Sequence, residues 1–117
     1  MNKKTKKLWK LIDSDTDGML VTSPENVRYL CGFSGTEGTL LLSRGKSFFF
    51  TDGRYATQAR QQIRQFSIVT FSEKWKSLAR IIKNLRIRSI GFEARHVTVA
   101  FFQELQKESP GLKLKPY

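Results

Sequence analysis

The stretch 38–52 reads GTLLLSRGKSFFFTD and contains two apolar runs, LLL at 40–42 and FFF at 48–50. Arg44, Gly45 and Lys46 separate these runs. Three such residues are typical of a hairpin loop in which the glycine adopts a positive φ. The stretch therefore predicts two neighbouring antiparallel strands, at 38–43 and 47–52.

The segments around this hairpin alternate between strand and helix patterns. Further strands are predicted at 18–24, 66–72 and 88–94, and helices at 54–63, 73–85 and 97–108. We expect Ser72 to cap the middle helix. The closing LKLKPY alternates leucine with lysine, which is typical of an edge strand. This order predicts an α/β fold, a mixed sheet with helices on both faces. At 117 residues the chain fits a single domain over 1–117.

The net charge of +11 is unevenly distributed along the chain. Residues 1–12 carry five lysines and no acid. Residues 13–59 carry four basic and six acidic side chains, a net charge of −2, whereas residues 60–117 carry twelve basic and four acidic side chains, a net charge of +8. The middle of the chain is thus the least basic part, which argues against a phosphate-bearing ligand there.

The lysine-rich N-terminus, MNKKTKKLWK, allows two interpretations. It could be an arm that binds nucleic acid. The interleaved Leu8, Trp9, Leu11 and Ile12 favour a short amphipathic helix laid on the sheet. The basic start is not followed by an apolar stretch or a cleavage site, so we expect a cytoplasmic protein with no membrane contact.

Two motifs resemble ligand-binding loops without completing them. DSDTDG at 13–18 matches the first half of a calcium-binding EF-hand loop, but the position of its bidentate glutamate is Pro24. Gly32, Gly35 and Gly38 follow a GxxGxxG spacing, which differs from the dinucleotide and phosphate-loop patterns. We therefore expect a solvated turn in the first case and tight turning of the chain in the second.

The remaining candidates for chemistry are few. Cys31 is the only cysteine and His96 the only histidine, so we expect a buried hydrophobe and a structural or solvent-facing residue, respectively. Asp52 and Glu93 each stand at the carboxyl end of a predicted strand, where α/β sheets bind ligands. They fit the rim of a site, or equally well a structural cap or ion pair.

Longer stretches of the sequence resemble a known family. NVRYLCGFSGTEGTLLL at 26–42, FFFTDGRYATQA at 48–59 and IGFE at 90–93 are similar, in order and spacing, to the N-terminal domain of Xaa-Pro aminopeptidases, the family that also holds prolidase and creatinase. The similarity extends from Gly18 to Tyr117. It implies a ribonuclease-H-like mixed sheet and a noncatalytic role.

The resemblance also implies what lies beyond this sequence. A larger "pita-bread" catalytic domain would follow and hold two divalent metal ions, such as Mn, Co or Zn, while this chain would hold no cofactor. The expected partners are that catalytic domain, a second subunit of a homodimer, and proline-containing peptides. The parent protein would be a peptidase, and the isolated domain would be inactive.

In such domains the glycine-rich segment faces the catalytic cleft, often that of a neighbouring subunit. The resemblance therefore implies that the glycines let the backbone approach a protein surface and a peptide. The implied candidates for the rim of the substrate cleft are Tyr29, Phe33, Ser34, Gly35, Asp52 and Arg54. Phe33 would be an apolar rim residue. Cys31 departs from the family pattern, where threonine or serine is commoner, so exact substrate contacts do not carry over.

The alternative is a basic nucleic-acid-binding or nuclease domain with the same ribonuclease-H-like topology. Such a nuclease needs about four clustered carboxylates that hold two metal ions. The predicted strand ends offer only Asp52 and Glu93. We therefore favour the peptidase domain and expect no nucleic-acid partner.

Overall fold

The computed structural model describes residues 2–117. Its centre is a mixed sheet of six strands in the order β4-β3-β2-β1-β5-β6. The strands are β1 (Gly18–Val21), β2 (Thr39–Ser43), β3 (Ser47–Asp52), β4 (Ser67–Phe71), β5 (Ser89–Phe92) and β6 (Lys113–Pro116). The α-helices are α1 (Lys3–Lys10), α2 (Pro24–Cys31), α3 (Ala56–Gln62), α4 (Lys74–Asn84) and α5 (Val99–Glu108), and a 3₁₀ turn, η1 (Gly53–Tyr55), precedes α3.

The strand directions confirm the predicted α/β fold with its ribonuclease-H-like mixed sheet. β1, β2 and β3 form an antiparallel meander, while β4 pairs parallel with β3, β5 with β1 and β6 with β5. Only β2 therefore runs against the other five strands. β6 lies at one edge of the sheet, as its alternating lysines predict.

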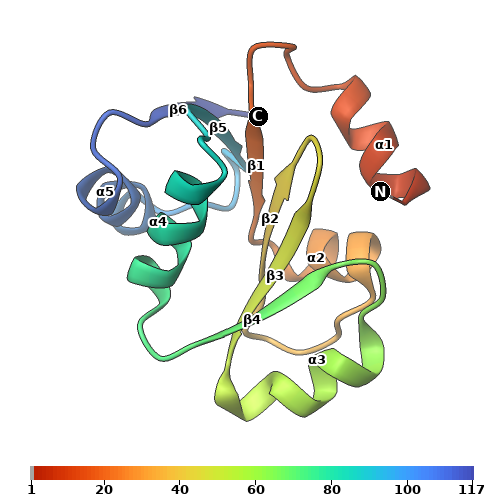
Figure 1. Cartoon of the computed structure of the whole chain (residues 1–117). Coiled ribbons are helices and arrows are strands. Elements are labelled where there is room, and N and C mark those ends of the chain that lie inside the picture. The colour runs from red at the N-terminus through yellow and green to blue at the C-terminus, as the bar shows by residue number, and fades with distance from the viewer. Residues whose placement is uncertain (1) are drawn as a thin grey trace.

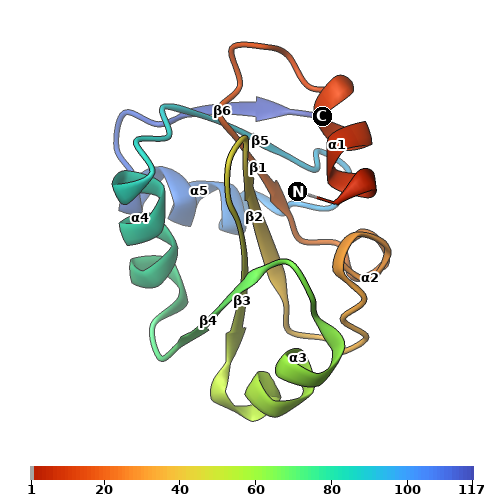
Figure 2. The ribbon, with the colours of Figure 1, turned by 45° about the vertical axis from the view of Figure 1, so that its right-hand side comes forward.

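Helices cover both faces of the sheet, with α1, α2 and α3 on one side and α4 and α5 on the other (Figures 1 and 2). Successive side chains of each central strand point to opposite faces. In β2, Leu40 and Leu42 contact the α1–α3 side, and Leu41 contacts the α4–α5 side; all three are fully buried. Because both faces are covered, the strands read as continuous apolar runs instead of alternating ones.

The hairpin between β2 and β3 is tighter than the sequence suggests. Ser43 and Lys46 pair through a backbone hydrogen bond of 3.1 Å, and the Lys46 amide also donates to Ser43 Oγ at 2.9 Å. These bonds close the turn around Arg44 and Gly45 alone. Gly45 does not have a positive φ, so the prediction of a left-handed glycine there is wrong.

Two helix starts also differ from expectation. The strand predicted to continue to Pro24 ends at Val21, and α2 begins at once, with Ser23 as its N-cap and Pro24 in its first turn. Its C-cap is Gly32, at a φ of 87°, which only glycine adopts without strain. In α4 the N-cap is Glu73 and not Ser72, and no side chain caps that terminus.

The N-terminal segment forms the amphipathic helix that its apolar residues favour. Trp9 and Ile12 are buried in the core on the α1–α3 side, and the Arg44 guanidinium lies 4.4 Å from the centre of the Trp9 ring. Leu11, by contrast, is 78% exposed. Within residues 2–117, no helix is long and apolar enough to cross a membrane.

Candidate functional site

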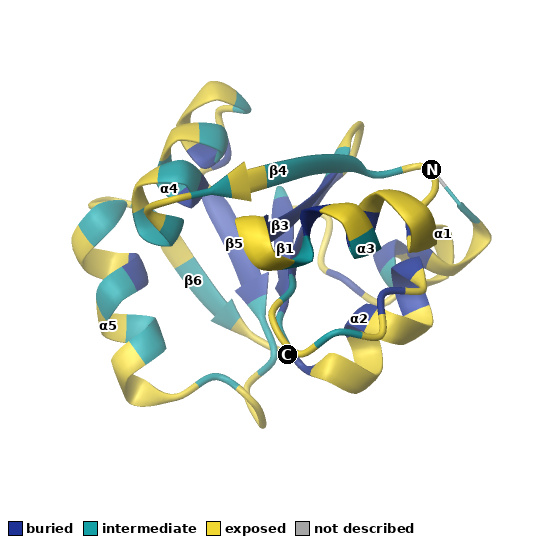
Figure 3. Ribbon diagram, turned by 90° about the horizontal axis from the view of Figure 1, so that it is seen from below, coloured by how far each residue is buried: buried dark blue, intermediate teal, exposed yellow. Residues whose placement is uncertain are grey.

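The carboxyl ends of β1, β3 and β5 meet at one edge of the sheet, because these three strands are parallel to one another. This edge is at the bottom of Figure 1, and Figure 3 views the molecule from that side. The loop 32–38 and the turn 52–55 both lie at this edge, after α2 and β3 respectively. Parallel strands place binding groups at this edge, so it is the first surface to consider as a site.

The loop 32–38 is fastened to α3 by two glutamine side chains. The Ser34 amide donates to Gln62 Oε1 at 3.0 Å, and Gln62 Nε2 donates to Ser34 Oγ at 2.9 Å. Gln58 Nε2 lies 3.3 Å from both Ser34 Oγ and Gln62 Oε1. Ser34 is therefore an exposed residue held in one orientation, which suits it to present its hydroxyl at a surface.

Aromatic rings underlie this loop. Phe33 is only 1% exposed and packs against Phe49 at 4.6 Å and against Tyr55 at 6.0 Å between ring centres. An ideal Cβ on Gly35 would lie 2.7 Å from Phe33 Cε2, and one on Gly38 would lie 2.6 Å from Phe49 Cζ. The groups that approach these two glycines most closely are thus the protein's own rings.

This packing bears on the expectation that Phe33 is an apolar rim residue. In this structure the Phe33 side chain is buried beneath the loop and does not form part of the exposed surface. Gly35 also lacks a positive φ, so its place depends on the space above the Phe33 ring and not on backbone conformation. Both residues support the surface from below.

The turn after β3 is built by Asp52 and Arg54. Asp52 Oδ1 accepts from the Arg54 amide at 2.9 Å and caps η1, and the Arg54 guanidinium returns to the same carboxylate at 2.8 Å. The Arg54 hydrogen bonds hold the pKa of Asp52 below its ordinary value. Arg54 also lies 5.4 Å from the centre of the Tyr55 ring.

Tyr55 joins the two parts of this surface. Its hydroxyl lies 3.1 Å from Thr36 Oγ1, and its ring lies 3.3 Å from the Cβ position of Gly35. Through these contacts Ser34, Gly35, Asp52 and Arg54 belong to one continuous surface. We call these four residues the edge surface.

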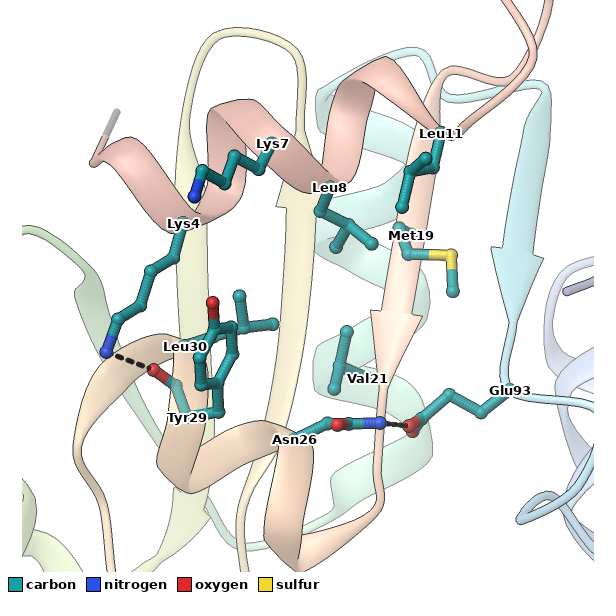
Figure 4. Close-up of a pocket in the computed structure, with 10 residues that line it drawn as sticks. All are labelled: Lys4, Lys7, Leu8, Leu11, Met19, Val21, Asn26, Tyr29, Leu30 and Glu93. Atoms are coloured by element: carbon teal, nitrogen blue, oxygen red, sulfur yellow. Dashed lines mark hydrogen bonds between the residues drawn. The ribbon is translucent and has the colours of Figure 1, made fainter.

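Tyr29 lies elsewhere, on a groove between α1 and α2 (Figure 4). Its ring is stacked under the Lys4 ammonium at 4.6 Å, and Lys4 Nζ donates to the Tyr29 carbonyl at 3.0 Å. The predicted rim residues are therefore divided between two surfaces. The sequence gives no sign of this division, since it depends on how α1 packs beside α2.

Glu93 fastens the start of α2 to the end of β5. Its carboxylate accepts from the amides of Thr22 and Ser23 at 2.6 and 2.8 Å, from Ser23 Oγ at 2.7 Å and from Asn26 Nδ2 at 2.6 Å. Burial raises the pKa of Glu93, but the hydrogen bonds from Asn26, Ser23 and Thr22 outweigh it and leave the pKa below its ordinary value. Of the two roles open from the sequence, the structural cap is the one observed.

The family model for the creatinase/prolidase N-terminal domain matches residues 6–117 of this sequence. This chain belongs to that family. A curated relative, an uncharacterized peptidase (YqhT) of Bacillus subtilis, is 39% identical over 83 residues, which are 70% of this chain and 24% of the relative. The family match confirms the resemblance seen in the sequence.

Solved structures show the same creatinase/prolidase domain. An Xaa-Pro dipeptidase from Bacillus anthracis superposes with a TM-score of 0.91 at 29% identity, covering 98% of this chain and 33% of that protein. The N-terminal domain of the cytoplasmic peptidase PepQ from Mycobacterium tuberculosis gives 0.81 at 32% identity, covering 97% and 88%. This chain thus spans about a quarter to a third of the two longer relatives, YqhT and the Bacillus anthracis dipeptidase, and the PepQ structure is that of an N-terminal domain.

The EF-hand-like aspartates of this creatinase/prolidase domain all have structural partners, and Asp13 and Asp15 share Lys115. Asp13 Oδ2 accepts from the Tyr117 hydroxyl at 3.1 Å, Asp15 Oδ1 binds Lys115 Nζ at 2.6 Å, and Asp17 Oδ2 accepts from the Arg88 amide at 3.0 Å. Within residues 2–117, no three histidine, cysteine or acidic side chains are grouped so that they could hold a metal ion. The donor groups described here do not fit a dinuclear metal site.

The other two predicted residues lie as expected. Cys31 is buried, and burial raises the pKa of its thiol, which keeps it protonated and unreactive. His96 is exposed at the carboxyl edge.

Lys74, which is not among the residues predicted from the sequence, lines a shallow pocket at the same edge together with Thr36, Glu37 and His96. Its ammonium lies 5.5 Å from the Trp75 ring centre and 5.3 Å from that of Phe101. Burial lowers its pKa, and the nearby Glu37 only partly offsets this effect. One signal in the sequence could have identified Lys74. It stands in the first turn of α4, the helix that follows β4, and β4 ends at this edge of the sheet.

Proposed function

We propose that this chain is the noncatalytic N-terminal domain of a metallopeptidase that hydrolyses Xaa-Pro peptide bonds. The observation that carries the proposal is the likeness of nearly the whole chain to one third of an Xaa-Pro dipeptidase, at 29% identity and a TM-score of 0.91. An Xaa-Pro aminopeptidase from Streptococcus thermophilus, 31% identical with a TM-score of 0.86, supports the same substrate class.

Catalysis then belongs to a domain that follows residue 117. The described residues do not fit a dinuclear metal site, so two divalent ions, such as Mn, Co or Zn, would be held by that domain. When bound there, the ions would supply a Lewis acid and an activated water. The residues of this chain carry no step of the hydrolysis, and the isolated domain is inactive.

The edge surface is the part of this domain that we assign to the rim of the substrate cleft. Ser34 is fixed by Gln62 and Gln58, and Arg54 is fixed by Asp52, so both present polar groups in a set geometry. Pre-oriented groups bind a peptide at a smaller entropic cost than mobile ones. The parent protein would act in the cytoplasm, as the PepQ relative is described to do, and as a homodimer whose second subunit contributes to the cleft.

The nucleic-acid alternative has less support. A ribonuclease-H-type site needs clustered, free carboxylates. Here the Asp52 carboxylate binds Arg54, and the Glu93 carboxylate accepts hydrogen bonds from Ser23 and Asn26 at the start of α2. The basic side chains alone do not identify a nucleic-acid partner.

Peptide hydrolysis by the full-length protein tests the proposal. With Mn²⁺ or Co²⁺ it should cleave Xaa-Pro peptides and leave matched Xaa-Ala peptides intact, while residues 1–117 alone should cleave neither. A full-length protein without this preference would refute the substrate class. Metal-dependent turnover by residues 1–117, abolished by a substitution within them, would refute the noncatalytic role.

A further inference from the structure

The groove between α1 and α2 is an apolar hollow with a volume of about 350 Å³. Its floor is made by Leu8 of α1, Met19 and Val21 of β1, and Leu30 of α2 (Figure 4). This volume accommodates one or two apolar side chains, and small-ligand sites begin at about the same size. The groove is separate from the edge surface.

Exposed apolar side chains gather at this groove. Within the described residues, four large hydrophobic side chains are exposed: Leu11, Tyr29, Val99 and Tyr117. Leu11, 78% exposed, and Tyr29, 55% exposed, both line the groove. Exposed apolar side chains that form one patch beside polar groups mark an interaction surface, whereas single scattered ones do not.

The charge at the groove is positive. Lys4 and Lys7 lie at one end of it (Figure 4), and residues 1–12 contain no acid. The one acidic side chain in the lining, Glu93, has both carboxylate oxygens occupied by Ser23, Thr22 and Asn26. A partner that complements this surface would bring an apolar residue for the floor and an acidic one for the lysines.

Tyr117 lies beside the floor of the groove. Its hydroxyl accepts from the Asp13 amide at 3.3 Å and lies 2.9 Å from Thr16 Oγ1, in the loop that follows α1. Its ring and the Met19 side chain converge on Gly91, where an ideal Cβ would lie 2.8 Å from Tyr117 Cδ2 and 2.6 Å from Met19 Sδ. Residues that follow Tyr117 therefore leave from a fixed point next to a residue that lines the groove.

We propose that the segment directly following Tyr117 in the full-length protein docks into this groove and joins the two domains. It would place an apolar side chain over Leu8 and Met19 and an acidic one beside Lys4 and Lys7. The inference rests on the proposed function, because that function supplies a following domain. A tethered segment has an effective concentration on the order of millimolar at this site, so it is favoured over a second copy of the chain.

Cysteine accessibility tests the docking. Leu11→Cys is introduced with Cys31→Ala, and its rate of modification by a maleimide is measured in residues 1–117 and in the full-length protein. Docking should slow the reaction in the full-length protein by at least about tenfold, as expected for a surface that opens only through local fluctuations. Val99→Cys is the matched control, since Val99 is 72% exposed on α5, on the other side of the sheet; its rate should be alike in both proteins.

A charge change separates a specific contact from general crowding. Lys7→Glu should restore much of the Leu11→Cys reactivity in the full-length protein, whereas Lys83→Glu on α4 should not. Equal rates for Leu11→Cys in both proteins would overturn the proposal. Slow modification of residues 1–117 that depends on protein concentration would also overturn it, because a second copy would then be the occupant.

The outcome does not depend on activity. Xaa-Pro hydrolysis by the unsubstituted full-length protein is measured in parallel. If Leu11→Cys is protected in the full-length protein but Xaa-Pro peptides are not cleaved, the docking proposal stands and the proposed function is refuted. If the full-length protein cleaves Xaa-Pro peptides but Leu11→Cys reacts as fast as in residues 1–117, the proposed function stands and the docking proposal is refuted.

Discussion

The ring of Phe33 occupies the space into which a side chain on Gly35 would project. Only Ser34 separates them in the chain, yet an ideal Cβ on Gly35 would approach Phe33 Cε2 to 2.7 Å and Cζ more closely still. The ring cannot simply move aside, because Phe49 and Tyr55 pack against it. The glycine therefore lets the loop fold over its own core.

Gly35→Ala should accordingly destabilise the isolated domain. Forcing a methyl group into a packed site costs about 1–3 kcal/mol of unfolding free energy. Chemical denaturation of residues 1–117 measures this loss. Gly45→Ala is the control, since nothing lies within 4 Å of a Cβ at Gly45 and its φ is not positive. Equal stability of the two variants would show that the Phe33 ring yields at little cost.

Glu93→Gln should also destabilise the domain at neutral pH. A glutamine can accept through only one oxygen, so at least one of the donors at Thr22, Ser23 and Asn26 loses its partner. Unmet hydrogen bonds at a partly buried carboxylate cost roughly 1–3 kcal/mol. Glu73→Gln is the control, because Glu73 is exposed and pairs only with Lys76.

The Glu93 effect should depend on pH in one direction. The folded-state pKa of Glu93 lies below its ordinary value, so its carboxylate stabilises the fold fully above the unfolded-state pKa, about 4.3 for glutamate. This stabilisation is lost as the pH falls from there through the folded-state pKa. The stability difference between the unsubstituted protein and Glu93→Gln should therefore shrink between pH 6 and about pH 3. A constant difference would contradict a charged Glu93.

Arg54→Ala tests the edge surface in the full-length protein. If this surface forms the rim of the cleft, the substitution should raise KM for Xaa-Pro peptides about three- to tenfold with little change in kcat, the signature of lost substrate binding. The thermal stability of residues 1–117 should hardly change, because Arg54 is 73% exposed and ion pairs at the surface contribute little. Arg60→Ala, an exposed position on α3, serves as the control. An unchanged KM would remove Arg54 from the rim.

Cys31 should resist modification in the native protein. Burial both shields the thiol and raises its pKa, so little thiolate is available to react. A thiol reagent at pH 8 should modify native residues 1–117 at least about a hundredfold more slowly than the denatured chain, at a rate set by local opening. Rapid modification of the folded protein would contradict the buried position.

The strongest local signals in the sequence predict the elements well. The two apolar runs of the hairpin became β2 and β3, and Trp75, Leu78, Ile82 and Leu85 face one core from α4 and its C-cap. The sequence analysis does not predict α2, although Ser23, Pro24 and Gly32 are ordinary helix signals. The dense glycines indicate a loop there, and the predicted strand runs on to Pro24, whereas β1 ends at Val21.

The fold class and the turn at Asp52-Gly53-Arg54 follow from local signals in the sequence, because strand and helix periodicity, cap residues and turn glycines act over a few neighbouring positions. The family follows from the resemblance of the stretches 26–42, 48–59 and 90–93, which the family match confirms. Tertiary structure alone decided which candidates share a surface. Phe33 is buried in the core, where it packs against Phe49 and Tyr55, and the ring of Tyr29 lies under the Lys4 ammonium on α1. Burial and contact between segments distant in the chain depend on how helices pack on a sheet, and residue spacing does not encode that.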